Sequence, residues 1–130
     1  MRACRCMRNV ATNGMYKDVS PVQAYELLKS GVRYLDVRTV EEFLGGHAPK
    51  ALNIPVKLKT DTGMAPNVRF QAEVSELVPN KAETIVVGCK SGARSVAAIH
   101  LLSQEGYGDL QNLVGGWDAW SANPNLPVEK

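Results

Sequence analysis

Cysteine is scarce in this 130-residue chain, which contains only Cys4, Cys6 and Cys89. An odd number, with two near the N-terminus and one alone in the body, is a poor basis for a disulfide framework. A reducing compartment with free thiols is therefore expected. The C-x-C pair has no other cysteine or histidine nearby, so it falls short of the four ligands of a structural zinc site. We expect neither a metal nor a cofactor.

Long apolar runs and clusters of a single charge are also missing. No stretch approaches the roughly 20 apolar residues that cross a bilayer, so no membrane association is expected. The net charge of +2 at pH 7 suits small anionic ligands. It is too mild to indicate nucleic-acid binding, which usually comes with clustered Lys and Arg interleaved with aromatic residues. RNA and DNA are therefore not expected partners.

The first 15 residues differ in composition from the rest of the chain. They contain three arginines and no acidic residue. This is typical of an organellar transit peptide, but such peptides are also rich in serine, which is absent here. A frayed terminus or residues left from cloning fit equally well. We expect a flexible tail over residues 1–15 and one domain over residues 16–130, located in the cytoplasm or the plastid stroma.

The body alternates helix-like and strand-like segments. Ser20 as N-cap, Pro21 at the first helical position and Gln23 in a capping box predict the start of a helix. The β-branched residues 84–87 predict a buried strand. Further strands are predicted at 34–37, 51–54 and 110–114, helices at 41–43, 70–78, 93–105 and 117–121, and a surface loop at 57–66. This alternation predicts an α/β fold with a mostly parallel sheet covered by helices on both faces.

The segment VVGCKSGARS, residues 86–95, places Cys89 at the end of the buried strand and just before a helix. Ligands of parallel sheets bind beyond the carboxyl ends of the strands. The backbone amides that follow can form an anion cradle, helped by the helix dipole. A lone cysteine is often only a small apolar residue, but a polar, glycine-containing turn with two cations favours a nucleophile. The candidate binding residues are Lys90, Ser91, Gly92, Ala93 and Arg94.

Several other motifs occur in a fixed order along the chain. They are YLDVR at 34–38, EEF at 41–43, GH at 46–47, ALNIP at 51–55 and GGWDAW at 115–120. Together with the cysteine loop they resemble the rhodanese family of sulfurtransferases, in particular its single-domain, plant-type thiosulfate sulfurtransferases. The similarity runs from about residue 16 to residue 127. It implies a rhodanese-like fold, with a five-stranded parallel sheet flanked by helices on both faces.

The resemblance also implies a mechanism. The thiolate of Cys89 would take the outer sulfur of a small anionic donor such as thiosulfate and become a persulfide. The sulfur would then pass to cyanide, as in a thiosulfate:cyanide sulfurtransferase, or to a thiol such as glutathione or thioredoxin. The amides of residues 90–94 would stabilise the charge of the persulfide. We expect the protein to act as a monomer.

The remaining motif residues are expected to support the site rather than to react. Asp36 and Arg38 should form a hydrogen-bonded pair that holds loops near the cysteine. His47 is a conceivable general base, but it follows two glycines in a turn far from the cysteine loop, which favours a structural role. Helix packing is expected for Glu42, Phe43, Trp117 and Trp120.

Three alternatives to sulfur transfer follow from the same loop. Cysteine-dependent phosphatases of related fold use C-x5-R to wrap a phosphoryl group, whereas Arg94 gives C-x4-R and Ser95 occupies the phosphatase position. The shorter loop favours a sulfur atom over a phosphate. Reduction of arsenate by Cys89 with an external thiol reductant stays open. So does a non-enzymatic regulatory module, although the presence of the cysteine argues against it.

Overall fold

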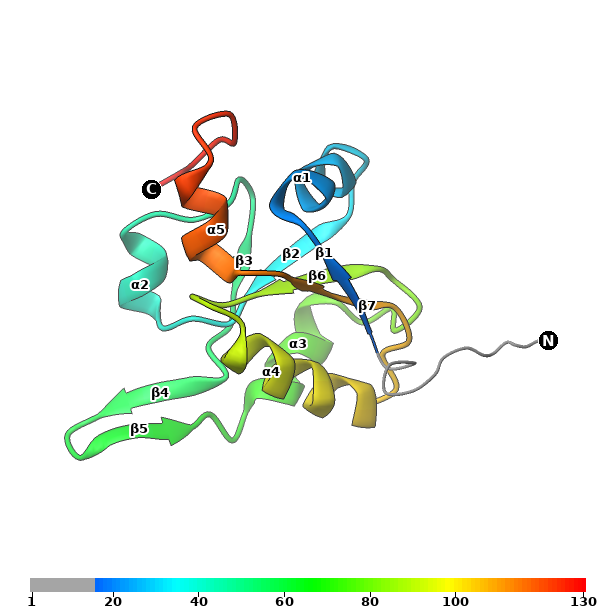
Figure 1. Ribbon diagram of the computed structural model, residues 1–130. Coiled ribbons are helices and arrows are strands. Elements are labelled where there is room, and N and C mark those ends of the chain that lie inside the picture. The colour runs from blue at the N-terminus through cyan, green and yellow to red at the C-terminus, as the bar shows by residue number, and fades with distance from the viewer. Residues whose placement is uncertain (1–15) are drawn as a thin grey trace.

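The computed structural model describes residues 16–130, and the predictions made for residues 1–15, including Cys4 and Cys6, lie outside the described residues (Figure 1). A five-stranded parallel sheet forms the centre of the molecule. In spatial order its strands are β1 (Lys17–Val19), β7 (Leu110–Leu113), β6 (Ile85–Gly88), β2 (Arg33–Asp36) and β3 (Leu52–Asn53). The predicted fold class is confirmed. The edge strand β1 was not predicted, because its three residues are too few to show an alternating pattern.

Helices cover both faces of the sheet (Figure 1). Helices α1 (Pro21–Lys29) and α5 (Gly116–Ala122) lie on one face, and α3 (Phe70–Leu77) and α4 (Ala93–Gln104) lie on the other. The central strand β6 is buried on both sides. Its Ile85 and Val87 pack in the apolar cluster with Phe70, and Val86 packs in the opposite cluster with Trp120. This two-sided burial explains why the strand reads as a continuous β-branched run.

Two helices begin with a capping box. At α1 the hydroxyl of Ser20 accepts a hydrogen bond from the amide of Gln23 at 3.1 Å, and the Gln23 side chain accepts one from the Ser20 amide at 2.9 Å, as predicted. Thr39 and Glu42 form the same arrangement at the start of α2 (Val40–Leu44). This second box was not predicted, and it fixes the position of Glu42.

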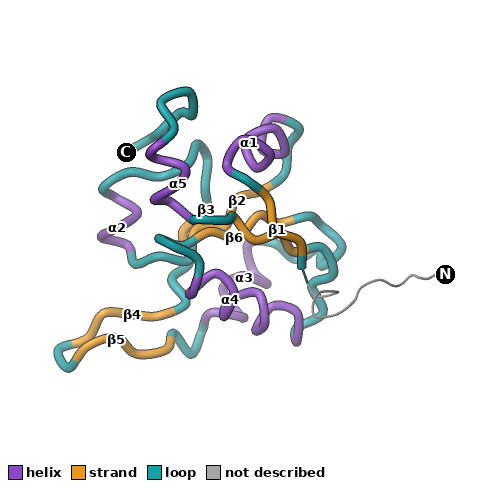
Figure 2. The backbone as a smooth tube through the Cα atoms, viewed as in Figure 1, coloured by secondary structure: helices purple, strands orange, loops and turns teal. Residues whose placement is uncertain are grey.

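The prediction of a surface loop at residues 57–66 is wrong, because this segment has regular secondary structure. It forms an antiparallel hairpin of β4 (Lys57–Thr60) and β5 (Gly63–Pro66), which projects from the body (Figure 2). The hydroxyl of Thr60 donates to the carbonyl oxygen of Gly63 at 2.6 Å and closes the turn. Almost every residue of both strands is exposed. Because alternating hydrophobicity reports a buried face, a hairpin without one gives no such signal.

None of the helices between residues 16 and 130 combines the length and the hydrophobicity needed to cross a bilayer. The longest is α4, with 12 residues, against roughly 20 for a membrane-spanning helix. Its buried apolar side chains, Ala98, Ile99 and Leu102, pack in the same cluster as the strand residues Ile85 and Val87.

Candidate active site

Cys89 lies immediately after β6, at the carboxyl-terminal edge of the sheet, and is almost completely buried. Its Sγ accepts a hydrogen bond from the backbone amide of Gly92 at 3.0 Å. Gly92 is the N-cap of α4 and has φ +132°, a conformation that favours glycine. Ser91 and Ala93 lie on the exposed side of the loop. Of the predicted cradle residues, Gly92 is thus the one whose amide contacts the sulfur.

Ser95 is the second neighbour of the sulfur, and sequence reasoning missed it. Its Oγ lies 3.6 Å from Cys89 Sγ and accepts a hydrogen bond from the thiol. Its own hydrogen faces two acceptors, Asn112 Oδ1 at 2.6 Å and the carbonyl oxygen of Gly92 at 2.9 Å. The Asn112 amide group donates in turn to the carboxylate of Asp18 at 3.1 Å. A hydrogen-bonded chain therefore runs from β1 through β7 to the sulfur.

The start of α5 holds the cysteine loop from the other side. The amide of Trp117 donates to the carbonyl oxygen of Cys89 at 2.7 Å, and the amide of Asp118 donates to that of Lys90 at 3.0 Å. Gly116 has φ +58°, and a Cβ atom there would lie 2.6 Å from both of these carbonyl oxygens. Gly116 of the GGWDAW motif thus allows a helix N-terminus to approach the loop closely.

Both cations of the loop are bound by carboxylates. Lys90 Nζ lies 3.1 Å from each carboxylate oxygen of Asp118, at an exposed position. Arg94 makes a bidentate pair with Glu42, with nitrogen–oxygen distances of 2.7 and 3.0 Å. Glu42 was expected to pack its helix, and the structure shows that its carboxylate binds Arg94. The pairing partners lie 28 and 52 residues away in sequence, so local patterns could not reveal them.

The Glu42 carboxylate is held in its ionised form. Its contacts with Arg94, together with hydrogen bonds from the amide and hydroxyl of Thr39 at 3.0 Å, lower the pKa of Glu42 to about 2, although partial burial opposes the shift. The same contact raises the pKa of Arg94. The pair is thus fully charged at any physiological pH, and Glu42 occupies both Nη1 and Nη2 of Arg94.

Asp36 and Arg38 form a buried ion pair behind the site. Arg38 Nη2 lies 2.7 Å from Asp36 Oδ2 and donates to the carbonyl oxygen of Gly46 at 2.8 Å. The guanidinium group also lies 5.0 Å from the ring centroid of Trp117. The pair therefore connects the end of β2 with the GH turn and with α5.

His47 faces the C-terminal segment. Its ring stacks on Phe43 at 3.7 Å, and its Nδ1 donates to the carbonyl oxygen of Phe43 at 2.9 Å. Its backbone exchanges two hydrogen bonds of 2.9 Å with Glu129. The contacts of His47 are thus with α2 and the chain end, and not with the cysteine loop.

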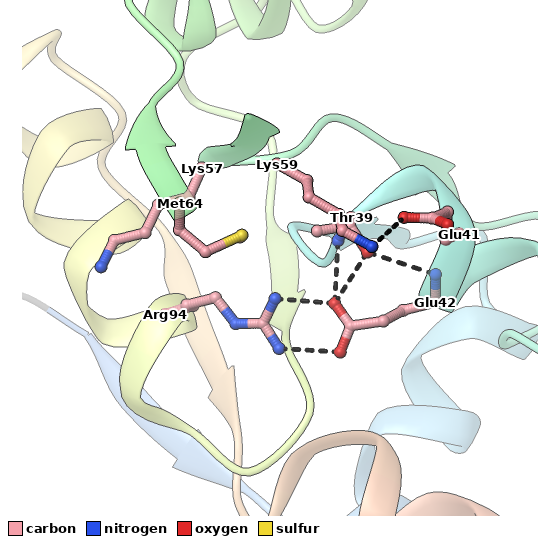
Figure 3. Close-up of a pocket in the computed structure, with 7 residues that line it drawn as sticks. All are labelled: Thr39, Glu41, Glu42, Lys57, Lys59, Met64 and Arg94. Atoms are coloured by element: carbon pink, nitrogen blue, oxygen red, sulfur yellow. Dashed lines mark hydrogen bonds and ion pairs between the residues drawn. The ribbon is translucent and has the colours of Figure 1, made fainter. Parts of the chain in front are cut away.

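A pocket of about 660 Å³ adjoins the Arg94–Glu42 pair (Figure 3). It is bounded by α2, by the β4–β5 hairpin and by the first turn of α4. Its lining residues are Thr39, Glu41, Glu42, Lys57, Lys59, Met64 and Arg94. In Figure 3 the Arg94 and Glu42 side chains point toward one another from opposite walls.

Comparison with known proteins matches this architecture to one family. The family profile described as the rhodanese-like domain covers residues 20–123. The chain belongs to the rhodanese-like family. Thiosulfate sulfurtransferase 18 of Arabidopsis thaliana is 50% identical over 105 residues, which are 79% of this chain and 75% of that protein. The chloroplastic thiosulfate sulfurtransferase 16 of the same plant is 43% identical over 111 residues, or 85% and 91% of the two chains.

Solved structures show the same fold. The crystal structure of a rhodanese-related protein from Thermoplasma volcanium superimposes with a TM-score of 0.64 at 27% identity. The match covers 88% of this chain and 98% of the other. The rhodanese fold expected from the motif order is therefore confirmed.

Proposed function

We propose that this rhodanese-like protein is a sulfurtransferase that moves a sulfane sulfur from thiosulfate to a thiol or cyanide through a persulfide on Cys89. The observation that carries the proposal is the position of Cys89. The residue directly follows a central strand, and its Sγ accepts a hydrogen bond from the Gly92 amide at 3.0 Å. Helix N-termini and inward amides stabilise negative charge. The two plant relatives named thiosulfate sulfurtransferases support the same reaction class.

In the first half-reaction the Cys89 thiolate attacks the outer sulfur of thiosulfate. A bond forms between Sγ and that sulfur, the bond between the two thiosulfate sulfurs breaks, and sulfite leaves with the electron pair. No external oxidant or reductant is needed. The amide of Gly92 and the start of α4 stabilise the anionic sulfur before and after transfer.

In the second half-reaction a nucleophile attacks the outer sulfur of the persulfide. Cyanide would leave as thiocyanate, and a thiolate would leave as its own persulfide, while Cys89 returns to the thiolate. The cycle is covalent and of the ping-pong type. The glutathione or thioredoxin expected from the sequence would serve as such a thiol.

Backbone amides, rather than side-chain cations, supply the anion site in this proposal. Arg94 is held in a bidentate pair with Glu42, and Lys90 lies at an exposed position beside Asp118. A phosphatase needs an arginine free to bind phosphoryl oxygens in a bidentate manner. The C-x4-R spacing and the engaged guanidinium both disfavour phosphate as the substrate.

Thiocyanate formation from thiosulfate and cyanide tests the proposal, with Cys89→Ser as the inactive comparison. The wild-type protein should turn over and the variant should not. Sulfite release without an acceptor should stop after about one equivalent, since each cysteine carries one sulfur. Arsenate-dependent oxidation of glutathione without sulfur transfer would instead identify an arsenate reductase. Equal thiocyanate formation by wild type and variant would overturn the mechanism.

A further inference from the structure

The 660 Å³ pocket adjoins the cysteine loop at Arg94 and is larger than the small substrates of the reaction require. Arg94 lines the pocket and also belongs to the first turn of α4, which begins at the cysteine loop (Figure 3). Thiosulfate and cyanide would leave most of this volume unfilled. Clefts of about 300–1,000 Å³ are typical of small-molecule sites, and this open pocket falls in that range.

The pocket presents charges of both signs. Lys57, in the hairpin, forms no ion pair with any residue between 16 and 130 under a 4.0 Å limit. Lys59 lies 3.5 Å from Glu41, but these side chains are 69% and 73% exposed. Exposed pairs of this kind are weak and exchange partners easily. Two lysines on one wall and one carboxylate on the other are therefore available to a ligand.

The side chains of the hairpin contribute little to packing. Its residues are almost all exposed, so its lysines do not serve to pack it on the body. Lys57, Lys59 and Met64 all contribute to the pocket wall. The thioether of Met64 adds an adaptable apolar contact among the charges.

We propose that this pocket binds the sulfur acceptor, and that the acceptor is an amino-acid or short-peptide thiol carrying an ammonium group and at least one carboxylate. Carboxylates of the acceptor pair with Lys57 and Lys59, its ammonium group pairs with Glu41, and its aliphatic part contacts Met64. This inference rests on the proposed sulfurtransferase function and assigns a place to its second substrate.

The transfer step balances without a further reactant. The acceptor thiolate attacks the outer sulfur of the Cys89 persulfide, a new bond forms between the acceptor sulfur and that outer sulfur, and the bond from the outer sulfur to Sγ breaks. The electron pair of that bond returns to Cys89 as the thiolate. The product is the persulfide of the acceptor, still held by its charged groups until it leaves the pocket.

The first test removes the positive wall with the double variant Lys57→Ala/Lys59→Ala. Steady-state rates are measured with thiosulfate as donor and with glutathione, cysteine, 3-mercaptopropionate, 2-mercaptoethanol or cyanide as acceptor. The KM for the three carboxylate-bearing thiols should rise about threefold to tenfold, as expected for the loss of partly screened charge pairs. The KM for 2-mercaptoethanol, for cyanide and for thiosulfate should change less than about twofold. The matched control is Lys17→Ala/Lys29→Ala, which removes two lysines that do not line the pocket.

The second test removes the negative wall with Glu41→Gln. Cysteine and 3-mercaptopropionate differ by the ammonium group, so the KM for cysteine should rise and that for 3-mercaptopropionate should not. Equal effects of the variants on all acceptors, or no effect on any, would overturn the proposed pocket. If the wild-type protein forms no thiocyanate at all, the proposed sulfurtransferase function itself is ruled out. The two failures are therefore distinguishable.

Discussion

The backbone amide of Trp117 lies 2.7 Å from the carbonyl oxygen of Cys89 and donates a hydrogen bond to it. Through this contact the first turn of α5 fixes the loop that carries the proposed nucleophile, although the two residues are far apart in sequence. The next residue of the helix makes an equivalent contact, because the Asp118 amide donates to the Lys90 carbonyl oxygen at 3.0 Å. The GGWDAW segment is therefore part of the support of the site, and not only a packing element.

Gly116→Ala should disrupt this contact. The new Cβ would lie 2.6 Å from the carbonyl oxygens of Cys89 and Lys90, at a φ of +58°. The loop must move or the helix must retreat, so we expect a loss of about 2 kcal/mol in the free energy of unfolding. Sulfur transfer should fall by about tenfold or more, because small displacements of a reacting atom are costly.

Gly108→Ala is the control for this variant, because a Cβ atom there meets nothing within 4 Å. Urea unfolding and thiocyanate formation are measured for both. Wild-type activity in folded Gly116→Ala would show that the α5 contact does not position the cysteine loop.

Glu42→Gln should expose Arg94 to the donor. Glutamine can preserve the capping box with Thr39, but it removes the charge that Arg94 binds at 2.7 and 3.0 Å. The freed guanidinium group should attract the thiosulfate dianion, so the KM for thiosulfate is expected to fall about threefold, with little change in kcat.

The converse variant, Arg94→Ala, leaves Glu42 as an unpaired carboxylate beside the site and should raise that KM. The double variant should return it toward the wild-type value. A raised KM in Glu42→Gln would mean that Arg94 acts only in the position that Glu42 imposes.

The Glu42–Arg94 pair also predicts a pH dependence of stability. The pKa of Glu42 is about 2 in the folded protein, below its ordinary value of 4.5. Its stabilising effect is therefore complete above about pH 5 and disappears as the pH falls toward 2. The stability lost in Glu42→Gln, about 1 kcal/mol for a pair at the protein surface, should shrink between pH 5 and pH 2. Urea unfolding of both proteins at pH 6 and pH 3 measures it, and an unchanged difference would contradict the assignment.

Ser95→Ala should weaken the site without unfolding it. The variant removes the Oγ atom at 3.6 Å from Cys89 Sγ and leaves Asn112 Oδ1 without its 2.6 Å partner. We expect a loss of about 1–3 kcal/mol in stability and a lower kcat, because the sulfur is less well positioned. Ser103→Ala on the same helix is the control. Undiminished kcat would show that Ser95 serves the fold alone.

The sequence was informative wherever the signal is local. The Ser20 capping box and the β-branched strand depend on neighbouring residues. The capping box was predicted at the residues where it occurs, and the strand was predicted at residues 84–87 and is found at Ile85–Gly88. The order of the motifs led to the family and hence to the five-stranded sheet. Cys89 directly follows that strand, as its place in the sequence predicted, and so lies at the edge where ligands of parallel sheets bind.

The sequence was silent where a contact depends on the tertiary fold. Glu42 and Arg94 are 52 residues apart, and Ser95 and Asn112 are 17 residues apart on different elements. These pairs form because the fold brings α2 and β7 next to the start of α4, and no local sequence pattern encodes that arrangement. The exposed hairpin at residues 57–66 was missed for a different reason, since its strands bury no face that could show an alternation.

Mass spectrometry of the protein after incubation with thiosulfate, without an acceptor, tests the central claim most directly. The account predicts the gain of a single sulfur atom, mapped to the peptide that contains Cys89, removed by cyanide or a thiol, and absent from Cys89→Ser. Sulfur on any other residue, or equal gain by the variant, would contradict a persulfide on Cys89 as the carrier.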